Sequence, residues 1–326
     1  TYRYLHTMGV DVAGIEPLRY YYKMPKLQGK FDPYDHQIQG AGFHVAFKRS
    51  YNFSTMRVGK TGTALIAMDY LQRVKHYSAC LIVCTVTNMS GVWEDEIQKS
   101  FPDKKVVLLD GTREERKEKL KQDADYYVVN FDGVKILEKE LLEMVKEGVI
   151  SLCIIDELSH YANARTGLWK SMNAVINDKT HPVEYVVGLT GSPGNSPEPV
   201  YAQSKLITPH NMKMRYTQWR DMTMYKVSTF TWAMNSRAKD LIETVLQPSI
   251  RFNKDDVFDL PEPERIYHHS PLVPEQERII KQFKDHLMAE IRTPTGAKEL
   301  AVADNRAIAV NKILQPCTGA VVVEDV

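Results

Sequence analysis

The stretch STMRVGKTGTAL, residues 54–65, contains the Gly-Lys-Thr tripeptide that is typical of phosphate-binding loops. Such a loop needs a tight turn after a strand, backbone N–H groups that point at the phosphates, and a helix that begins where the loop ends. Gly59 suits the turn, Lys60 would reach the β and γ phosphates, and Thr61 would bind Mg²⁺. The apolar spacing that starts at Leu65 predicts the helix.

Two positions of this stretch depart from the usual pattern. That pattern has a glycine five residues before Gly59, where this chain has Ser54. Arg57 stands where many such loops have a second glycine. A Gly-Lys-Thr tripeptide can also occur by chance in a basic surface loop. Other segments of the chain must therefore show whether this stretch is a phosphate-binding loop or a chance match.

The composition is that of an ordinary globular protein. The chain has 326 residues, 43% of them hydrophobic and 25% charged, which is enough for two domains or for one large domain with attachments. Its net charge of +1 argues against a surface that is basic all over but allows a local basic region. No apolar run approaches the roughly 20 residues that cross a bilayer, and no signal peptide is visible. We therefore expect an intracellular protein.

The four cysteines do not have the spacing of metal-binding pairs. Cys80 and Cys84 lie in or beside one apolar run, Cys153 lies in another, and Cys317 is isolated. We expect buried, reduced cysteines in strands rather than a metal site.

Short apolar runs alternate with polar segments of helical length. The runs are rich in Val and Ile without strict alternation, which predicts strands that are covered on both faces. One of the helical segments begins with Thr112 and Glu115 at the spacing of a capping box. The predicted strands are 80–86, 105–110, 126–131, 152–156 and 185–190, and the predicted helices include 63–74, 93–101, 112–122, 134–148 and 166–177. This order predicts an α/β fold with a parallel sheet and helices on both faces.

The N-terminal residues 1–32 are rich in tyrosine and basic side chains, with RYYYK at 19–23. Aromatic and cationic neighbours can stack on bases and touch phosphates. We favour the alternative, a strand of an N-terminal extension that packs on the main domain.

The parallel pattern stops after Pro209. Residues 274–292 predict one amphipathic helix, with apolar side chains four residues apart at Ile279, Phe283, Leu287 and Ile291. We favour core or interdomain packing for this face over a partner-binding surface. The final residues 318–326 are consistent with the beginning of another strand.

An acidic pair, Asp156 and Glu157, follows the apolar strand predicted at 152–156. Ligand sites of α/β proteins lie outside the carboxyl ends of the strands, so this position suits metal chemistry. Asp156 would hold the Mg²⁺ shell, and Glu157 would orient and polarise the attacking water. The alternative is a solvated pair that caps the next helix.

Two further segments support a nucleotide site only when they are considered together with the phosphate loop and the acidic pair. In VVGLTGSPGN, Thr190 and Ser192 follow another apolar strand and could bond to the acidic pair, although the segment is also an ordinary turn. In YDHQIQG, the Gln37 side chain carries a donor and an acceptor that suit the N6 and N7 edge of adenine. Tyr34 could pack on the adenine ring, whereas a lone glutamine is usually a surface residue.

These segments, in this order, resemble the first motor lobe of superfamily-two helicases, specifically the Swi/Snf-related ATPases. YDHQIQG resembles their adenine-reading motif. MRVGKTGTAL resembles motif I, and LIVCTVTNMSGVWEDEI resembles motif Ia. VVNFDGV resembles motif Ib. IIDELSHYANARTGLWKSM resembles motif II in the form seen in bacterial and phage members, and VVGLTGSPGNSPEPVYAQSKLI resembles motif III. LQPSIRFNKDDVFDLPEPE and PLVPEQERIIKQF resemble the segment that leads towards the second lobe, so the resemblance covers roughly residues 30 to 316.

The resemblance implies a role for each matching residue. ATP would be bound by Tyr34, Gln37, Arg57, Gly59, Lys60 and Thr61. Catalysis would depend on Lys60, Asp156 and Glu157, with Thr61 and Asp156 as Mg²⁺ ligands and with Thr190 and Ser192 coupling the site to motion. The loops after two strands would follow a DNA backbone through Thr85, Thr87, Asn88 and Asn130. Such phosphate contacts are independent of base sequence and sensitive to salt.

The resemblance predicts an ATP- and Mg²⁺-dependent DNA translocase or helicase, in the cytoplasm of a bacterial or phage-infected cell. It implies three parts: an N-terminal extension (1–32), the first RecA-like lobe (33–262), and a connector with the start of a second lobe (263–326). No segment matches motifs V and VI of the second lobe, which would supply arginine fingers, so we expect full activity to need that lobe.

Three alternatives to this motor follow from the same residues. One is a non-catalytic DNA-binding or regulatory module that keeps the ATPase fold. A second is a phosphate-loop enzyme of another class, such as a small-molecule kinase. A third is the motor of a restriction or repair complex, whose nuclease residues would lie elsewhere.

Overall fold

The computed structural model describes residues 18, 22–194, 196–228, 231–257, 270–292, 298–302 and 306–317. The chain divides into two compact units, Thr1–Leu260 and Pro261–Val326, and each is described by itself. None of the helices in the described ranges combines the length and the hydropathy that a membrane-spanning segment requires.

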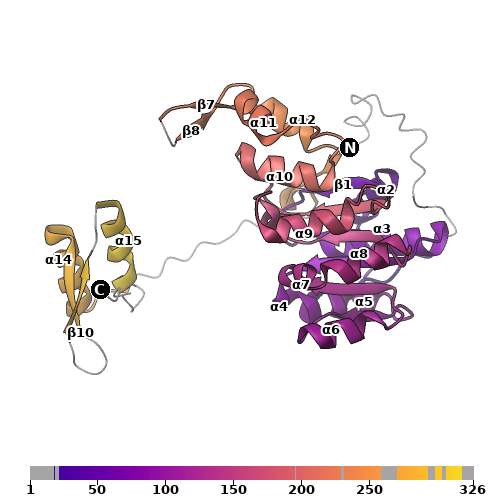
Figure 1. The fold of residues 1–326 in the computed structure, drawn as a ribbon. Helices are drawn as coiled ribbons and strands as arrows, with labels where there is room; N and C mark the ends of the chain where they lie inside the picture. Colours follow the sequence, from indigo (N-terminus) through magenta and orange to yellow (C-terminus); the bar gives the residue numbers. More distant parts are fainter. Residues whose placement is uncertain are drawn as a thin grey trace. The chain divides into compact units, whose positions relative to one another are not determined.

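A seven-stranded parallel sheet forms the centre of the first unit (Figure 1). The strand order is β3-β4-β2-β5-β6-β1-β9, and every neighbouring pair is parallel. The strands are β1 (Arg49–Asn52), β2 (Ala79–Cys84), β3 (Val106–Leu108), β4 (Tyr126–Asn130), β5 (Ile150–Ile155), β6 (Tyr185–Leu189) and β9 (Ser249–Ile250). The parallel α/β sheet and its five predicted strands are confirmed, whereas β1 and β9 were not predicted as strands.

Helices cover both faces of the sheet, because successive side chains of each strand point to opposite sides. In β2, for example, Leu81 and Val83 pack in one core, whereas Cys80 and Ile82 pack in the other. The helices α7 (Phe131–Ile136), α8 (Glu138–Lys146), α9 (Gly167–Ile176) and α10 (Pro197–Ile207) contribute to the first core. The helices α2 (Asp35–Ala46), α3 (Lys60–Lys75) and α5 (Asp95–Ser100) contribute to the second. Cys80, Cys84 and Cys153 are buried and free, as predicted.

Short helical elements complete this unit. They are α4 (Val86–Asn88), the π-helix η2 (Met89–Glu94), α6 (Arg113–Leu120), the 3-10 helix η3 (Leu158–Tyr161) and α13 (Lys254–Val257). The predicted capping box is present at α6, where the Thr112 N–H donates to the carboxylate of Glu115 and the Glu115 N–H donates to the hydroxyl of Thr112.

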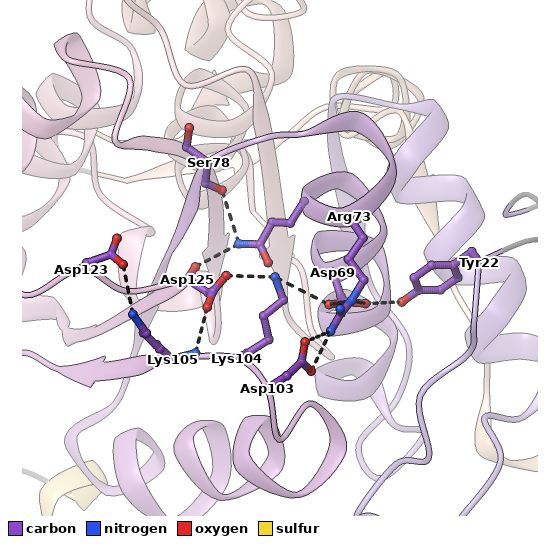
Figure 2. Close-up of polar contacts among 10 residues, drawn as sticks. Tyr22, Asp69, Arg73, Ser78, Asp103, Lys104, Lys105, Asp123 and Asp125 are labelled. Carbon is purple, nitrogen blue, oxygen red and sulfur yellow. Dashed lines mark hydrogen bonds and ion pairs between the residues drawn. The ribbon is translucent and has the colours of Figure 1, made fainter.

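The N-terminal extension packs on this unit, although its described residues form no regular strand. Leu18 and Tyr22 are buried in the same core as α3, while residues 19–21 lie outside the described residues. The Tyr22 hydroxyl donates to the buried carboxylate of Asp69 on α3 at 2.7 Å. Figure 2 shows this carboxylate also accepting from Arg73, within a network of lysines and aspartates around the start of β3 and β4.

A small α/β extension follows α10. It consists of α11 (Tyr216–Thr223), an antiparallel hairpin of β7 (Met224–Lys226) and β8 (Trp232–Met234), and α12 (Ala238–Val245). The hairpin forms a two-stranded sheet of its own, and Figure 1 shows it extending away from α11 and α12.

The second unit contains α14 (Pro274–His286), β10 (Met288–Arg292), β11 (Lys298–Val302) and α15 (Arg306–Cys317), with β10 and β11 antiparallel. Its small core includes Ile279, Phe283 and Ala289, with Leu287 and Ile291 packed against it. The prediction of one helix over 274–292 is therefore wrong beyond His286. Leu287 adopts a left-handed conformation (φ +58°), which ends the helix, and the chain turns into β10. The predicted strand at 318–326 lies outside the described residues.

Candidate functional site

The predicted site residues follow three neighbouring strands of the sheet. The loop of residues 53–59 follows β1, Asp156 follows β5, and Thr190 follows β6, which lies between them. Because all three strands are parallel, their carboxyl ends meet at the same edge. The fold therefore brings the three segments together.

The backbone of the loop accounts for the departure at Ser54 but not for the departure at Arg57. Within residues 53–60, positive φ angles occur at Arg57 (+64°) and Gly59 (+79°) and not at Ser54. A glycine is therefore not needed at Ser54, whereas Arg57 occupies a left-handed conformation that favours glycine. Ser54 is buried, and its hydroxyl accepts from the N–H of Phe252, which ties the loop to the segment after β9.

Gly59 is required for a second reason. A Cβ at this position would lie 2.3 Å from Nε2 of Gln37. The glycine thus gives α2 close access to the first turn of α3. Gln37 Nε2 donates to the Gly59 carbonyl at 3.2 Å, and the neighbouring His36 ring contacts the Val58 carbonyl at 2.9 Å.

Both polar atoms of the Gln37 side chain are engaged within the protein. Its Oε1 accepts from the backbone N–H of Tyr34 at 3.0 Å, while Nε2 donates to Gly59. Tyr34 is 57% exposed and stacks on His36, with ring centroids 5.6 Å apart. Each atom keeps one further hydrogen-bonding position, because a carboxamide has two N–H donors and two lone pairs on its oxygen.

Lys60 is the first residue of α3, a helix of 16 residues, and Gly59 is its N-cap. The Lys60 ammonium group donates to the carbonyls of Ser54 at 2.9 Å and Thr55 at 3.1 Å, within the loop itself. Burial lowers the pKa of Lys60, while the charges of Glu157 and Asp156 act in the opposite direction. The cation and both carboxylates therefore interact electrostatically at this edge. Thr61 follows in the same turn and is half-buried.

Asp156 is held by donors from two directions. Its Oδ1 accepts from the Glu157 N–H at 3.1 Å, and its Oδ2 accepts from the indole N–H of Trp93 at 3.0 Å. The Asn88 side chain also contacts Oδ2, at 3.5 Å. Glu157 has a positive φ of 52°, a conformation that costs about 1–3 kcal/mol and is frequent at functional sites.

The predicted coupling residues form a local turn. Thr190 is buried, and its backbone N–H donates to the Asn52 carbonyl at the end of β1. The Thr190 hydroxyl donates to the Ser192 carbonyl at 3.2 Å and accepts from the Ser192 N–H at 3.3 Å. This turn lies beside the phosphate loop, and no bond to the acidic pair is among its contacts.

The four predicted nucleic-acid residues differ in accessibility. Thr85 and Thr87 share a hydrogen bond after β2, and Thr87 is exposed. Asn88 faces Asp156 instead. Asn130 is buried at the end of β4, and its Oδ1 accepts from Arg116 at 2.9 Å.

The residues present fit a nucleotide with Mg²⁺. Carboxylate and hydroxyl oxygens are the ligands that Mg²⁺ prefers, and the N-terminus of a long helix favours phosphate. Within the described ranges, no group of three or more His, Cys, Asp or Glu could hold a metal ion. An ion at Asp156 and Thr61 would thus share its shell with phosphate oxygens and water.

Sequence reasoning missed three residues that shape this site. His36 and Phe252 pack together beside the loop, with ring centroids 5.4 Å apart, and Trp93 orients Asp156. His36 is adjacent to Gln37, and Trp93 lies in the segment that resembles motif Ia, so the motif matches contained both. Phe252 lies in the matched segment LQPSIRFNKDDVFDLPEPE, but its place beside the loop depends on β9 lying beside β1, which was not predicted.

Residues 55–195 match the family described as type III restriction enzyme, res subunit. The fold is similar to that of the SWI2/SNF2 ATPase core of Sulfolobus solfataricus in complex with double-stranded DNA, with a TM-score of 0.58 and 18% identity over 82% of this chain and 54% of that chain. A structure described as the core domain matches with a TM-score of 0.56 and 18% identity over 83% and 53%. No curated protein matches significantly. The chain thus spans about half the length of the solved structures it resembles.

Proposed function

We propose that this chain, whose first unit has the RecA-like fold of a superfamily-two helicase-like first lobe, belongs to an ATP-dependent motor that translocates along DNA. The observation that carries the proposal is the convergence at one sheet edge of Lys60, Asp156 and Glu157 beside the N-terminus of α3. A cation, two carboxylates and a helix N-terminus suit the triphosphate of a nucleotide and the water that attacks it.

The contacts of Lys60 suggest how ATP would enter. The ammonium group is held by two neutral carbonyls, those of Ser54 and Thr55. Phosphate oxygens would replace these carbonyls, because an anionic acceptor attracts the ammonium group more strongly than a neutral carbonyl does. The same loop would then present its N–H groups and the cation of Arg57 to the phosphates.

The acidic pair would divide the remaining tasks. Asp156, oriented by Trp93 and Glu157, would hold Mg²⁺ together with Thr61. The ion would neutralise charge that develops on the phosphate oxygens. Glu157 would orient the attacking water, and Thr190 and Ser192 would pass changes at the phosphates to the rest of the lobe.

DNA would be followed at the same edge by the loops after β2 and β4. Thr85 and Thr87 offer hydroxyl groups to backbone phosphates, whereas Asn88 and Asn130 would act through Asp156 and Arg116. Contacts of this kind position a protein without selecting a sequence.

The test is Lys60→Ala in the full-length protein, with DNA-stimulated ATP hydrolysis as the measurement. We expect a loss of about 100-fold or more, as for removal of one transition-state donor. Lys75→Ala is the matched control, because Lys75 is exposed at the other end of the same helix. Unchanged hydrolysis in Lys60→Ala would show that the site is assigned wrongly. Stimulation by metabolites instead of DNA would favour a small-molecule kinase.

The match to the family described as type III restriction enzyme, res subunit, favours one specific form of this motor, the motor of a restriction complex. A pull-down of the full-length protein followed by a DNA cleavage assay tests it. Cleavage that needs both ATP and a co-purified or fused nuclease supports this form, whereas ATP-dependent movement without cleavage supports a translocase alone.

A further inference from the structure

Positive charge is concentrated in one part of the chain. Residues 199–239 contain seven Lys and Arg but one acidic residue, Asp221, which gives a net charge of +6. The chain as a whole carries +1, so the remaining residues carry −5. This segment includes α11, the β7–β8 hairpin and the start of α12.

Five of these cations are exposed and lack a partner of opposite charge. They are Lys213, Arg215, Lys226, Arg237 and Lys239, and none of them forms an ion pair within the described residues. The acidic Asp221 is already paired with Arg220 at 2.9 Å. Since like charges repel, such a surface is stabilised by a polyanion.

Aromatic side chains are interleaved with the cations. The Arg220 guanidinium lies over the Trp232 ring at 4.1 Å, and Lys226 is the direct cross-strand neighbour of Trp232. Tyr225 is 55% exposed and pairs with the small Ala233. Flat rings beside cations suit bases and backbone phosphates at once.

The hairpin is held to the lobe at a defined place. The Asn235 N–H donates to the Thr223 carbonyl, which closes the hairpin base and brings Arg237 next to it. The Trp219 indole N–H donates to the Pro197 carbonyl at 2.7 Å, at the beginning of α10. Since α10 begins shortly after the Thr190 turn, α11 lies towards the same sheet edge as the candidate site.

We propose that the hairpin and its flanking helices form a second nucleic-acid-binding surface, which we call the hairpin surface: Arg215, Tyr225, Lys226, Trp232, Arg237 and Lys239. The cations contact the sugar–phosphate backbone, and Tyr225 stacks on a base where the strand is single. The inference rests on the proposed function for the class of partner, but the surface binds without ATP and outside the loops after β2 and β4.

The test measures binding of the full chain to fluorescently labelled single-stranded and duplex DNA, without nucleotide, at several salt concentrations. The variant carries Arg215→Gln, Lys226→Gln, Arg237→Gln and Lys239→Gln. We expect at least about tenfold weaker binding at low salt and a salt dependence reduced by about one unit of slope per lost contact. Tyr225→Ala is expected to weaken single-stranded binding about tenfold and duplex binding less.

The control removes the same charge elsewhere, through Lys30→Gln, Lys75→Gln, Lys139→Gln and Lys179→Gln, all at exposed positions. Equal losses in both variants would overturn the proposal, since net charge alone would then explain binding. Unchanged binding in the hairpin variant would overturn it as well. The binding assay contains no nucleotide, so a failure of the ATPase assignment leaves its result unaffected. Replacing Lys226 and Lys239 by Arg should preserve affinity.

Discussion

The indole N–H of Trp93 donates to Oδ2 of Asp156 at 3.0 Å. Trp93 is fully buried in η2, the π-helix that continues the loop after β2, whereas Asp156 directly follows the neighbouring strand β5. The bond therefore connects a loop that we assign to DNA with the carboxylate that we assign to Mg²⁺. A shift of η2 would move the donor and with it the carboxylate, and π-helices are frequent at functional sites.

Trp93→Phe removes this donor while keeping most of the buried ring. We expect the Mg²⁺ concentration for half-maximal nucleotide binding to rise about tenfold, because hydrogen-bond partners of metal ligands typically contribute 10- to about 100-fold. Titration of Mg²⁺ at fixed fluorescent ATP analogue measures the shift.

Trp169→Phe is the matched control for this substitution. Trp169 is also buried and donates its indole N–H at 2.9 Å, but to the Ala202 carbonyl. Both variants lose one buried indole donor, so Trp169→Phe reports the effect of that loss away from Asp156. If both change Mg²⁺ dependence equally, orientation of Asp156 is not the cause.

Gly59→Ala tests the close approach of α2 to the phosphate loop. The substitution imposes a left-handed alanine at φ +79° and places a Cβ 2.3 Å from Gln37 Nε2. Gly148→Ala imposes nearly the same backbone conformation, at φ +75°, with no atom within 4 Å of the new Cβ. We expect Gly148→Ala to lower the free energy of unfolding by about 1 kcal/mol and Gly59→Ala by more.

Shortening the Gln37 side chain should reduce the additional loss of unfolding free energy that Gly59→Ala shows over Gly148→Ala. In urea unfolding, Gln37→Ala combined with Gly59→Ala should be less destabilised than the sum of the single variants, because residues in contact are not additive. Additive effects would mean that the loop moves away from α2 without cost. Nucleotide binding should not recover, since the loop conformation remains altered.

The strands in the middle of the sheet could be predicted because burial on both faces leaves an almost uniform apolar run. The same criterion failed for β1, whose sequence RSYN contains two buried polar residues, Ser50 and Asn52. These side chains hydrogen-bond to the buried His44 of α2, and such contacts between a helix and the following strand leave no apolar pattern in the sequence. The two-residue strand β9 is too short for any pattern.

Periodicity was also misleading at residues 274–292. Ile279 and Phe283 do lie in the core of a helix, but Leu287 and Ile291 continue the spacing by chance in a turn and a strand that pack on the same core. The convergence of the candidate site residues at one sheet edge could be predicted, because these residues follow strand ends in a recognisable order. The order of the motifs did not predict the hydrogen bonds that orient the site residues, namely those from Trp93 to Asp156 and from Gln37 to Gly59.

The pH dependence of stability should reflect His44. This side chain is completely buried, with its ring nitrogens facing the Ser50 hydroxyl at 2.8 Å and the Asn52 amide at 3.4 Å. Burial lowers the pKa of His44 from 6.5 to about 3. The folded protein therefore keeps the imidazole neutral below pH 6.5, whereas the unfolded chain takes up a proton, so stability falls as the pH falls from 6.5 towards 3.

His44→Gln removes the titrating group and keeps a side chain that can hydrogen-bond to Ser50 and Asn52. Between pH 7 and pH 5, the parent should lose about 2 kcal/mol more unfolding free energy than this variant, from about 1.4 kcal/mol per unit of pKa difference. Comparing the two proteins by urea unfolding cancels groups that oppose this trend, such as Asp69, whose pKa is raised by burial. His181→Gln, at an exposed histidine, should follow the parent. Parallel loss of stability in the parent and His44→Gln would show that His44 takes up its proton in the folded protein as readily as in the unfolded chain.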